Sequence, residues 1–262
     1  MRVFESVAEY RAWRKLVGAE RIGFVPTMGA LHIGHQSLLE RSVADNDVTV
    51  LSIYVNPTQF DNADDLNKYP DTLAQDLELA ESLGVDVVIK PTYEQMYADD
   101  FRYLVDETHF SKELCGAHRD GHFTGVLTIV MKLLNLVKPH SAYFGEKDYQ
   151  QLKLIRDMVA AFFMDVEIVG CPTVREPSGL AFSSRNLNLN AIGRKLAPSI
   201  YREISSDKSD SEVIAALTFE GFAVDYCETR YGRRFVAARV GEGAEEVRLI
   251  DNVPVTNVSA GN

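Results

Sequence analysis

The chain has 262 residues, of which 46% are hydrophobic and 25% are charged, a composition that supports one large or two modest globular domains and argues against disorder. It carries 38 acidic and 27 basic residues, and the net charge of −11 disfavours a nucleic-acid partner because it repels a phosphate backbone. The amino terminus lacks the apolar core of a signal peptide, and no apolar run reaches the roughly 18 residues that a membrane span requires. We therefore expect a cytoplasmic protein without a membrane partner.

Short apolar runs alternate with helical patterns along the first two thirds of the chain. The runs, several of them rich in Val and Ile, predict strands buried on both faces of a sheet, over residues 22–25, 48–55, 85–89, 142–144 and 166–169. Between them, apolar residues recur every three or four positions, which predicts helices over residues 36–44, 72–83, 126–137 and 149–163. This alternation is typical of a doubly wound, Rossmann-like parallel sheet.

The pattern changes after the segment Glu176-Pro177-Ser178-Gly179, so we expect a domain boundary here, between residues 1–174 and 175–262. Beyond it, an amphipathic stretch at residues 194–204 precedes alternating runs at residues 223–229, 234–240 and 246–250. The alternating runs predict a small antiparallel sheet. The predicted fold is α/β: a Rossmann-like doubly wound parallel sheet with a smaller C-terminal α+β lid domain.

The segment Pro26-Thr27-Met28-Gly29-Ala30-Leu31-His32-Ile33-Gly34-His35 follows the first predicted strand and leads into the first predicted helix. Ligands bind at this end of a doubly wound sheet. Gly29 and Gly34 allow close approach to the backbone, and the amides and positive dipole end of the helix suit a triphosphate. His32 and His35 can donate hydrogen bonds to phosphoryl oxygens from one face. The segment is therefore predicted to bind a nucleotide.

For a lone pair of histidines, an ordinary surface or core role is the alternative, but a preceding strand and glycine turn favour the ligand site. A zinc site is disfavoured because the helical metal motif HExxH has its ligands four residues apart. His118 and His122 have that spacing, but Gly121 lies between them. No protein metal ligand is predicted.

Three further segments carry polar groups: Tyr54–Phe60, Tyr143–Gln151 and Arg175–Asn186. In the first, the amide of Gln59 can donate to a carboxylate or hydroxyl, although a loop glutamine is usually only solvated. In the second, Lys147 supplies a charge for phosphate and Asp148 can bind ribose hydroxyls; a capping Asp beside a solvated Lys is the alternative.

Together, the four segments resemble the pantothenate synthetase family in order and spacing, over residues from about 21 to 190. The HIGH element alone is shared with the wider nucleotidyltransferase superfamily and does not choose the substrate. The resemblance implies an ATP-dependent ligase that condenses (R)-pantoate with β-alanine to pantothenate, AMP and pyrophosphate through pantoyl adenylate. It also implies Mg²⁺ on the ATP, and a homodimer formed through the N-terminal domain.

The resemblance assigns roles to individual residues. The groups that would stabilise charge on the triphosphate are His32, His35, Lys147, Ser183 and Arg185. The residues that would hold the organic substrates are Gln59 and Gln151, with Asn56 and Arg119 beside them. Besides residues 28–35, the nucleotide site would include Gly145, Glu146, Lys147, Asp148, Val174, Phe182, Ser183, Ser184 and Arg185. Ser183-Ser184-Arg185 resembles the counterpart of the KMSKS loop of this superfamily, whereas a surface turn is the alternative.

The sequence also departs from the family. Asp120 stands where the family usually has proline, Phe182 stands where methionine is common, and the C-terminal domain is short. Two rival functions stay open: a nucleotidyltransferase that leaves AMP on its product, and a non-catalytic nucleotide-binding or tRNA-interacting module. In the favoured interpretation, the second domain hinges near residues 173–178 and shields the adenylate from water.

Overall fold

The computed structural model describes residues 1–61, 66–67, 69–241, 243 and 246–255. The chain divides into two compact units, one formed by residues 1–146 and 150–172 and the other by residues 147–149 and 173–262. The sequence predicts one boundary, between residues 174 and 175. In the structure, the change of unit follows residue 172, and a short excursion at residues 147–149 also belongs to the second unit.

Six strands form the sheet of the first unit, in the order β1-β4-β3-β2-β5-β6, and every neighbouring pair is parallel. Their bounds are β1 Arg2–Phe4, β2 Ile22–Thr27, β3 Val48–Ile53, β4 Val87–Ile89, β5 Ser141–Gly145 and β6 Glu167–Cys171. The predicted doubly wound α/β sheet is therefore confirmed. Burial on both faces is wrong for β6, an edge strand that is partly exposed along most of its length. Strand β1, the other edge, was not predicted.

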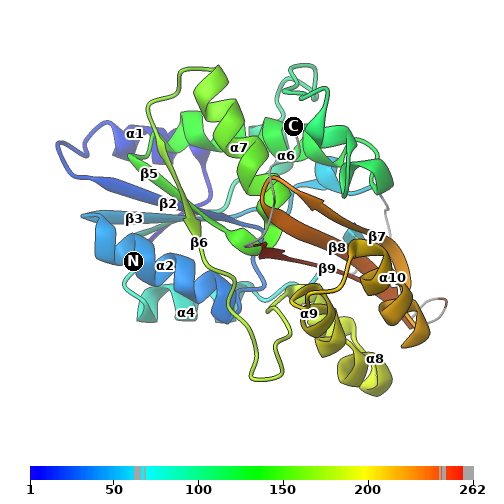
Figure 1. Ribbon diagram of the computed structural model, residues 1–262. Coiled ribbons are helices and arrows are strands. Elements are labelled where there is room, and N and C mark those ends of the chain that lie inside the picture. Colours follow the sequence, from blue (N-terminus) through cyan, green and yellow to red (C-terminus); the bar gives the residue numbers. More distant parts are fainter. Residues whose placement is uncertain (62–65, 68, 242, 244–245, 256–262) are drawn as a thin grey trace. The chain divides into compact units, whose positions relative to one another are not determined.

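Helices cover both faces of this sheet (Figure 1). On one side lie α2 Ile33–Asp45 and α4 Leu73–Ser82, and on the other lie α1 Val7–Arg14, α6 His122–Val137 and α7 Tyr149–Ala161. A short helix, α5, spans Tyr93–Met96. Leu38, Leu39 and Ala80 of the first pair pack against Val25 and Leu51 of the sheet, and each fully buried aliphatic side chain contributes about 1.5–3 kcal/mol.

The strand order reverses between β2 and β5, which are neighbours in the sheet although β3 and β4 lie between them in the chain. Ligands of doubly wound sheets bind at such a reversal, outside the carboxyl ends of the strands. The segment after β2 that contains His32 and the segment after β5 that begins at Gly145 both start at this edge. The topology therefore places two of the predicted motifs at the expected position.

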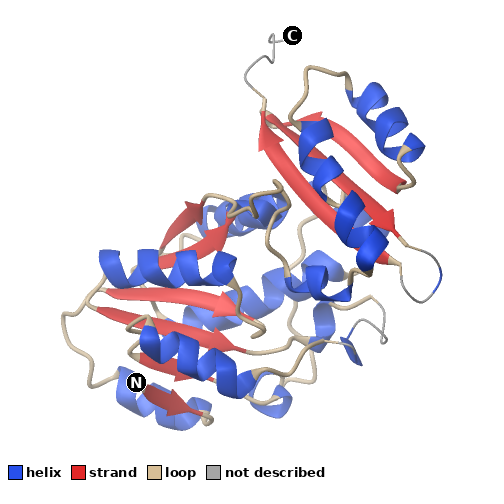
Figure 2. Ribbon diagram, turned by 90° about the horizontal axis from the view of Figure 1, so that it is seen from below, coloured by secondary structure: helices blue, strands red, loops and turns tan. Residues whose placement is uncertain are grey.

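The second unit contains an antiparallel sheet of β7 Ala223–Arg230, β8 Arg233–Val240 and β9 Val247–Pro254, as predicted. Helices α8 Ala191–Leu196, α9 Pro198–Ile204 and α10 Asp210–Phe219 lie on one face of it (Figure 2). The single stretch expected at residues 194–204 is two helices, because Pro198 has no backbone N–H to continue the first one and instead begins α9. Helix α10 was not predicted.

The core of this unit joins Ile200 and Ile204 of α9 and Leu217 of α10 to Val236 and Leu249 of the sheet. Residues 147–149 are attached to the same sheet: Asn252 Nδ2 donates to Lys147 O at 2.8 Å, and the Arg233 guanidinium lies 4.3 Å from the centre of the Tyr149 ring. Across the described ranges of both units, no helix is long and apolar enough to cross a membrane.

Candidate functional site

The loop after β2 turns sharply in a left-handed backbone conformation. Gly29 has φ +80° and Ala30 has φ +51°, a region that favours glycine and is strained for alanine. The loop is fixed by hydrogen bonds: Gly29 N donates to Thr27 Oγ1 at 3.2 Å, and the amides of Ala30 and Leu31 donate to the Asp76 carboxylate at 2.9 and 2.8 Å. The predicted glycine turn therefore exists and is held by a residue of α4.

His32 and His35 cap the amino terminus of α2. His32 Nδ1 accepts from Gly34 N at 3.1 Å and His35 Nδ1 accepts from His32 N at 3.4 Å, a reciprocal capping box. The two rings stack with centroids 4.0 Å apart. Because each Nδ1 accepts a backbone proton, a neutral ring carries its own proton on Nε2. The predicted pair is thus brought together with two Nε2–H donors at a helix start, where the helix dipole favours an anion.

Asn56 organises the loop that contains Gln59. Its side chain is 1% exposed, and its Nδ2 donates to Gln59 Oε1 at 3.1 Å and to Gly125 O at 3.3 Å. Its Oδ1 accepts from Tyr97 at 2.8 Å. Burial raises the pKa of Tyr97 to about 12, so this hydroxyl keeps its proton. Asn56 therefore orients the Gln59 amide.

Gln59 in turn reaches the nucleotide segment. Its Nε2 donates to Met28 Sδ at 3.3 Å, which joins the predicted acid-binding amide to the loop after β2. Its backbone carbonyl accepts from His122 Nδ1 at 2.8 Å and from Arg119 at 3.4 Å. His122 Nε2 lies 3.1 Å from Arg119 Nη1, and because arginine only donates, His122 must accept there and donate through Nδ1.

Arg119 also pairs with Asp61, at 3.1 Å between Nε and Oδ1. Burial alone would raise the pKa of the Asp61 carboxyl, but the Arg119 guanidinium outweighs it and holds the pKa below its ordinary value. Gly125 of α6 packs so closely on the loop that an added Cβ would lie 2.3 Å from Thr58 O. The Gln59 loop is therefore clamped against α6 by both packing and polar bonds.

At the end of β5, an added Cβ on Gly145 would meet no described atom within 4 Å, which leaves room for a ligand. Glu146 follows as the last residue of the first unit before the excursion. Gln151 is half-buried in α7, whereas the adjacent Gln150 is 5% exposed and bonds to Cys115 N, Phe110 O and Glu113 O. Gln150 is thus structural, whereas Gln151 keeps part of its surface exposed.

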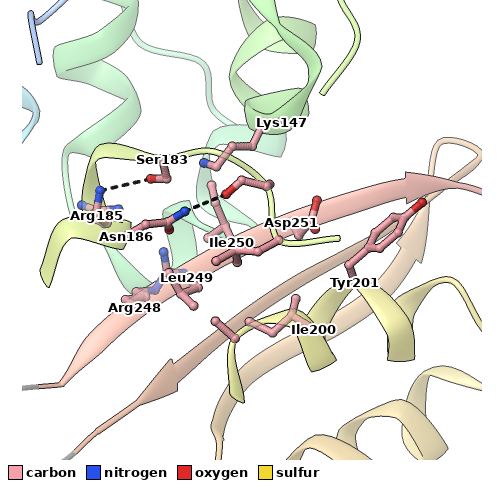
Figure 3. A pocket seen from close by; sticks show the side chains of 13 residues that line it. Lys147, Ser183, Arg185, Asn186, Ile200, Tyr201, Arg248, Leu249, Ile250 and Asp251 are labelled. Carbon is pink, nitrogen blue, oxygen red and sulfur yellow. Dashed lines mark hydrogen bonds between the residues drawn. The ribbon is translucent and has the colours of Figure 1, made fainter. Parts of the chain in front are cut away.

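In the second unit, Lys147, Ser183 and Arg185 line one pocket (Figure 3). Ser183 is the N-cap of a short 3-10 helix, and its Oγ accepts from Arg185 N at 3.3 Å. Lys147 is largely buried, with 18% of its side chain exposed, and its Nζ lies 3.6 Å from Asp148 Oδ1. The lining therefore includes the two predicted cations and the predicted hydroxyl, groups suited to phosphate.

Other predicted residues of this unit lie outside that lining. Phe182 N donates to Val174 O at 3.1 Å, so these two residues are neighbours across a turn, but neither lines the pocket, and neither do Asp148 and Ser184. Arg248, Asn186 and Asp251 do line it and were not predicted. Asp251 forms a two-fold ion pair with Arg175, at 2.5 and 2.8 Å. This pair holds the Asp251 side chain in place in the lining of the pocket.

The other contributors missed by sequence reasoning are Asp76 and His122. Asp76 stands in an ordinary amphipathic helix pattern, and His122 was considered only as a metal ligand. Their contacts with the loops that hold Gln59 and Ala30 span 63 and 46 residues, so no local spacing could have indicated these roles. Among the residues that the structure describes, no group of three or more His, Cys, Asp and Glu side chains could hold a metal ion.

Comparison with known proteins places this arrangement in a family. Residues 2–254 match the model of the family described as pantoate-beta-alanine ligase. The chain is 54% identical over 253 residues to pantothenate synthetase of Bdellovibrio bacteriovorus, covering 97% of this chain and 99% of that protein. It is 49% identical to the Legionella pneumophila (strain Lens) protein of the same name, covering 96% and 99%.

Solved structures of the same family resemble this chain along almost its whole length. A pantoate-beta-alanine ligase from Francisella tularensis, complexed with beta-gamma ATP and beta-alanine, has a TM-score of 0.91 and 40% identity, covering 97% of each chain. Pantothenate synthetase from Thermus thermophilus has a TM-score of 0.87 and 41% identity, covering 97% of this chain and 99% of the other. The chain belongs to the pantoate–β-alanine ligase family.

Proposed function

We propose that this protein condenses (R)-pantoate with β-alanine at the expense of ATP, giving pantothenate, AMP and pyrophosphate. Family membership supports the reaction, and the Francisella relative was solved with beta-gamma ATP and beta-alanine. The observation that carries the proposal within this chain is the bond between Gln59 Nε2 and Met28 Sδ. It joins an amide suited to an organic acid to the loop that leads into a helix start suited to a nucleotide.

In the first half-reaction, a pantoate carboxylate oxygen attacks the α-phosphorus of ATP in line. The new P–O bond forms as the bond from the α-phosphorus to the oxygen bridging the β-phosphate breaks, and pyrophosphate leaves with that electron pair. His32 and His35 donate through Nε2 to the phosphoryl oxygens on which charge grows, and Lys147, Ser183 and Arg185 bind the departing phosphates. Gln59 and Gln151 hold the pantoate, and Asn56 and Arg119 act through the Gln59 loop.

In the second half-reaction, the neutral amine of β-alanine attacks the carbonyl carbon of pantoyl adenylate. A C–N bond forms, the bond to the adenylate oxygen breaks, AMP leaves with the electron pair, and the amine gives up a proton. AMP is a good leaving group, so alignment and exclusion of water suffice and no covalent enzyme intermediate is required. Gly145, Glu146, Asp148, Val174, Phe182 and Ser184 contribute to the nucleotide site in this proposal.

ATP enters as its Mg²⁺ complex, so the cation comes with the substrate and needs no dedicated protein cage. We further propose a homodimer formed through residues 1–174 and a cytoplasmic location. Light scattering on the purified chain tests the dimer: a mass of twice 29.3 kDa is expected, and a monomeric mass at micromolar concentration contradicts it.

The decisive test is exchange of labelled pyrophosphate into ATP without β-alanine. The wild-type protein should exchange label only when pantoate is present, because exchange requires reversal of pantoyl-adenylate formation. His35→Ala should lower the rate about 100- to 1,000-fold, the usual cost of losing one donor to a developing negative charge. His109→Ala, a change at an exposed histidine outside the site, serves as control. Exchange that ignores pantoate would rule out this half-reaction.

Product stoichiometry distinguishes the proposed ligase from a nucleotidyltransferase that leaves AMP on its product. The proposed ligase releases one AMP for each pantothenate, whereas a nucleotidyltransferase would retain AMP on its product. A non-catalytic nucleotide-binding module would bind ATP without any exchange. Each rival thus predicts a result that the ligase does not give.

A further inference from the structure

We infer that Asp76 is a positioning residue for adenylate formation: its buried carboxylate fixes the backbone of residues 30 and 31 and thereby aims His32 and His35. The inference rests on the proposed function, in which these histidines act on the leaving pyrophosphate. Asp76 contacts the histidine segment only through the backbone, so it acts through other groups rather than on the substrate.

The carboxylate is almost completely enclosed. Asp76 is 3% exposed and lies in the first turn of α4. Its Oδ1 accepts from Leu31 N at 2.8 Å, and its Oδ2 accepts from Ala30 N at 2.9 Å and from Thr72 Oγ1 at 3.1 Å. No lysine, arginine or histidine of the described residues forms an ion pair with it. A buried carboxylate is costly without hydrogen bonds, so its partners are the two loop amides and the hydroxyl.

The loop needs this support because its backbone is strained. Ala30 adopts φ +51° directly after Gly29 at φ +80°, and a non-glycine residue in this region costs about 1–3 kcal/mol unless its surroundings hold it there. The space is equally tight: an added Cβ on Gly29 would lie 3.0 Å from Asp76 Oδ2. Carboxylate and loop thus fit each other closely, and neither can relax alone.

The consequence reaches the histidines through one peptide unit. Leu31, held by Oδ1, is followed by His32, the N-cap of α2 with an extended backbone, and His32 and His35 are bound to each other through the capping box. A shift of the backbone at residues 30 and 31 therefore moves both rings. Misplacing a catalytic group by about 1 Å can cost on the order of 100-fold in rate.

The test is Asp76→Asn, which keeps the shape but replaces one oxygen by an NH₂ group that faces an amide donor. Pantoate-dependent pyrophosphate exchange should fall about 10- to 100-fold, while the KM for pantoate changes less than about threefold, because Gln59 and its Asn56 support are untouched. Reaction of β-alanine with chemically prepared pantoyl adenylate should stay within about threefold of wild type, since the histidines act on the pyrophosphate.

The matched control is Asp86→Asn. Asp86 is exposed and also accepts from a backbone amide, Thr49 N at 2.8 Å, but at the amino end of β3. The Asp86→Asn variant should carry out both half-reactions at wild-type rates. The inference would be overturned if Asp76→Asn lost both half-reactions equally, or if this variant exchanged pyrophosphate at the wild-type rate. Absence of pantoate-dependent exchange in the wild-type protein would instead overturn the proposed function, so the two failures are distinguishable.

A second variant covers the case in which Asp76→Asn does not fold. Thr72→Val removes only the hydroxyl that donates to Asp76 Oδ2. Pyrophosphate exchange should slow about threefold. The backbone amides of Ala30 and Leu31 should take up deuterium faster than in the wild-type protein. If Thr72→Val leaves both the reaction and those two amides at wild-type rates, the carboxylate does not control the loop and the inference fails.

Discussion

The candidate residues of the two units are held in place by different kinds of contact. In the first unit, bonds come from far along the chain: His122 binds the Gln59 carbonyl across 63 residues, and Asp76 binds the Ala30 amide across 46. In the second unit, the turn with Ser183 and Arg185 is fixed by bonds spanning two and five residues. The first set is therefore preset by the fold, as is Lys147, whose carbonyl accepts from Asn252 across 105 residues, whereas these printed bonds of the Ser183–Arg185 turn lie within its own segment. Substitutions far along the chain should therefore affect the Gln59 and His32 loops more than the Ser183–Arg185 turn.

Among four substitutions that test this comparison, Asn56→Asp should have the largest effect, because a carboxylate would face Gln59 Oε1 and Gly125 O where an NH₂ group now donates. Leaving such buried groups unsatisfied costs about 1–3 kcal/mol, so kcat/KM for pantoate should fall up to about 100-fold while the KM for ATP stays near wild type. Asn135→Asp is the matched control: it is exposed and also donates to a backbone carbonyl. Equal losses for both substrates would contradict the role of Asn56 in orienting the Gln59 amide.

Arg185→Ala should come next. It removes a guanidinium from the pocket, and a hydrogen bond to a charged group contributes about 1.5–3 kcal/mol. The KM for ATP should rise about 10- to 30-fold, with the KM for pantoate unchanged. Arg230→Ala, at an exposed arginine of the same unit, should leave both values unchanged. Isothermal titration with a non-hydrolysable ATP analogue checks the loss, and unaltered nucleotide affinity would exclude Arg185 from phosphate binding.

Gly125→Ala tests the close packing of α6 on the Gln59 loop. The added Cβ would meet Thr58 O at 2.3 Å, so helix and loop must separate, at a cost of about 1–3 kcal/mol in unfolding free energy, and the KM for pantoate should rise about fivefold. Gly18→Ala, whose Cβ would meet its nearest atom at 3.4 Å, is the control. Urea unfolding and initial rates give both numbers, and a fully stable variant with wild-type KM would show that the contact does not position Gln59.

Asp61→Asn should have the smallest effect. The pKa of Asp61 lies below its ordinary value of 3.8 in the folded protein, so its contribution to stability is complete above that value and is lost as the pH falls through the lower, folded value. The pair with Arg119 is partly exposed, so solvent screening limits the loss at neutral pH to under about 1 kcal/mol. Denaturation at pH 7 and pH 3 checks the sign: the difference from wild type should shrink at pH 3.

The sequence predicted the elements whose pattern is local. Five parallel strands and the principal helices between them follow from apolar periodicity, and the HIGH segment follows from spacing. Strand β1 escaped because three residues with mostly exposed side chains carry no period. Helix α2 begins three residues before the expected position because His32 caps it, and capping by histidine is not among the usual signals.

The nucleotide motifs were predictable for the same reason, since each lies within ten or so consecutive residues. The support around them was not. Asp76, His122 and Gly125 contact the loops of the site only after folding brings α4 and α6 to them. Local patterns in a single sequence do not show which distant positions come into contact. The pattern thus indicates which groups we propose to react, while the tertiary structure determines how they are held.

The three-residue excursion at Lys147–Tyr149 limits how this protein can be recombined. The second unit contains these residues, yet in the chain they follow β5 and end at the first residue of α7, so the unit is not one continuous segment. A chimera that exchanges residues 173–262 with those of a relative would keep the host's Tyr149 beneath a foreign counterpart of Arg233, and the host's Lys147 carbonyl beside a foreign counterpart of Asn252. Swaps that carry residues 147–149 along with the C-terminal part should therefore yield active hybrids more often than swaps made at a single junction.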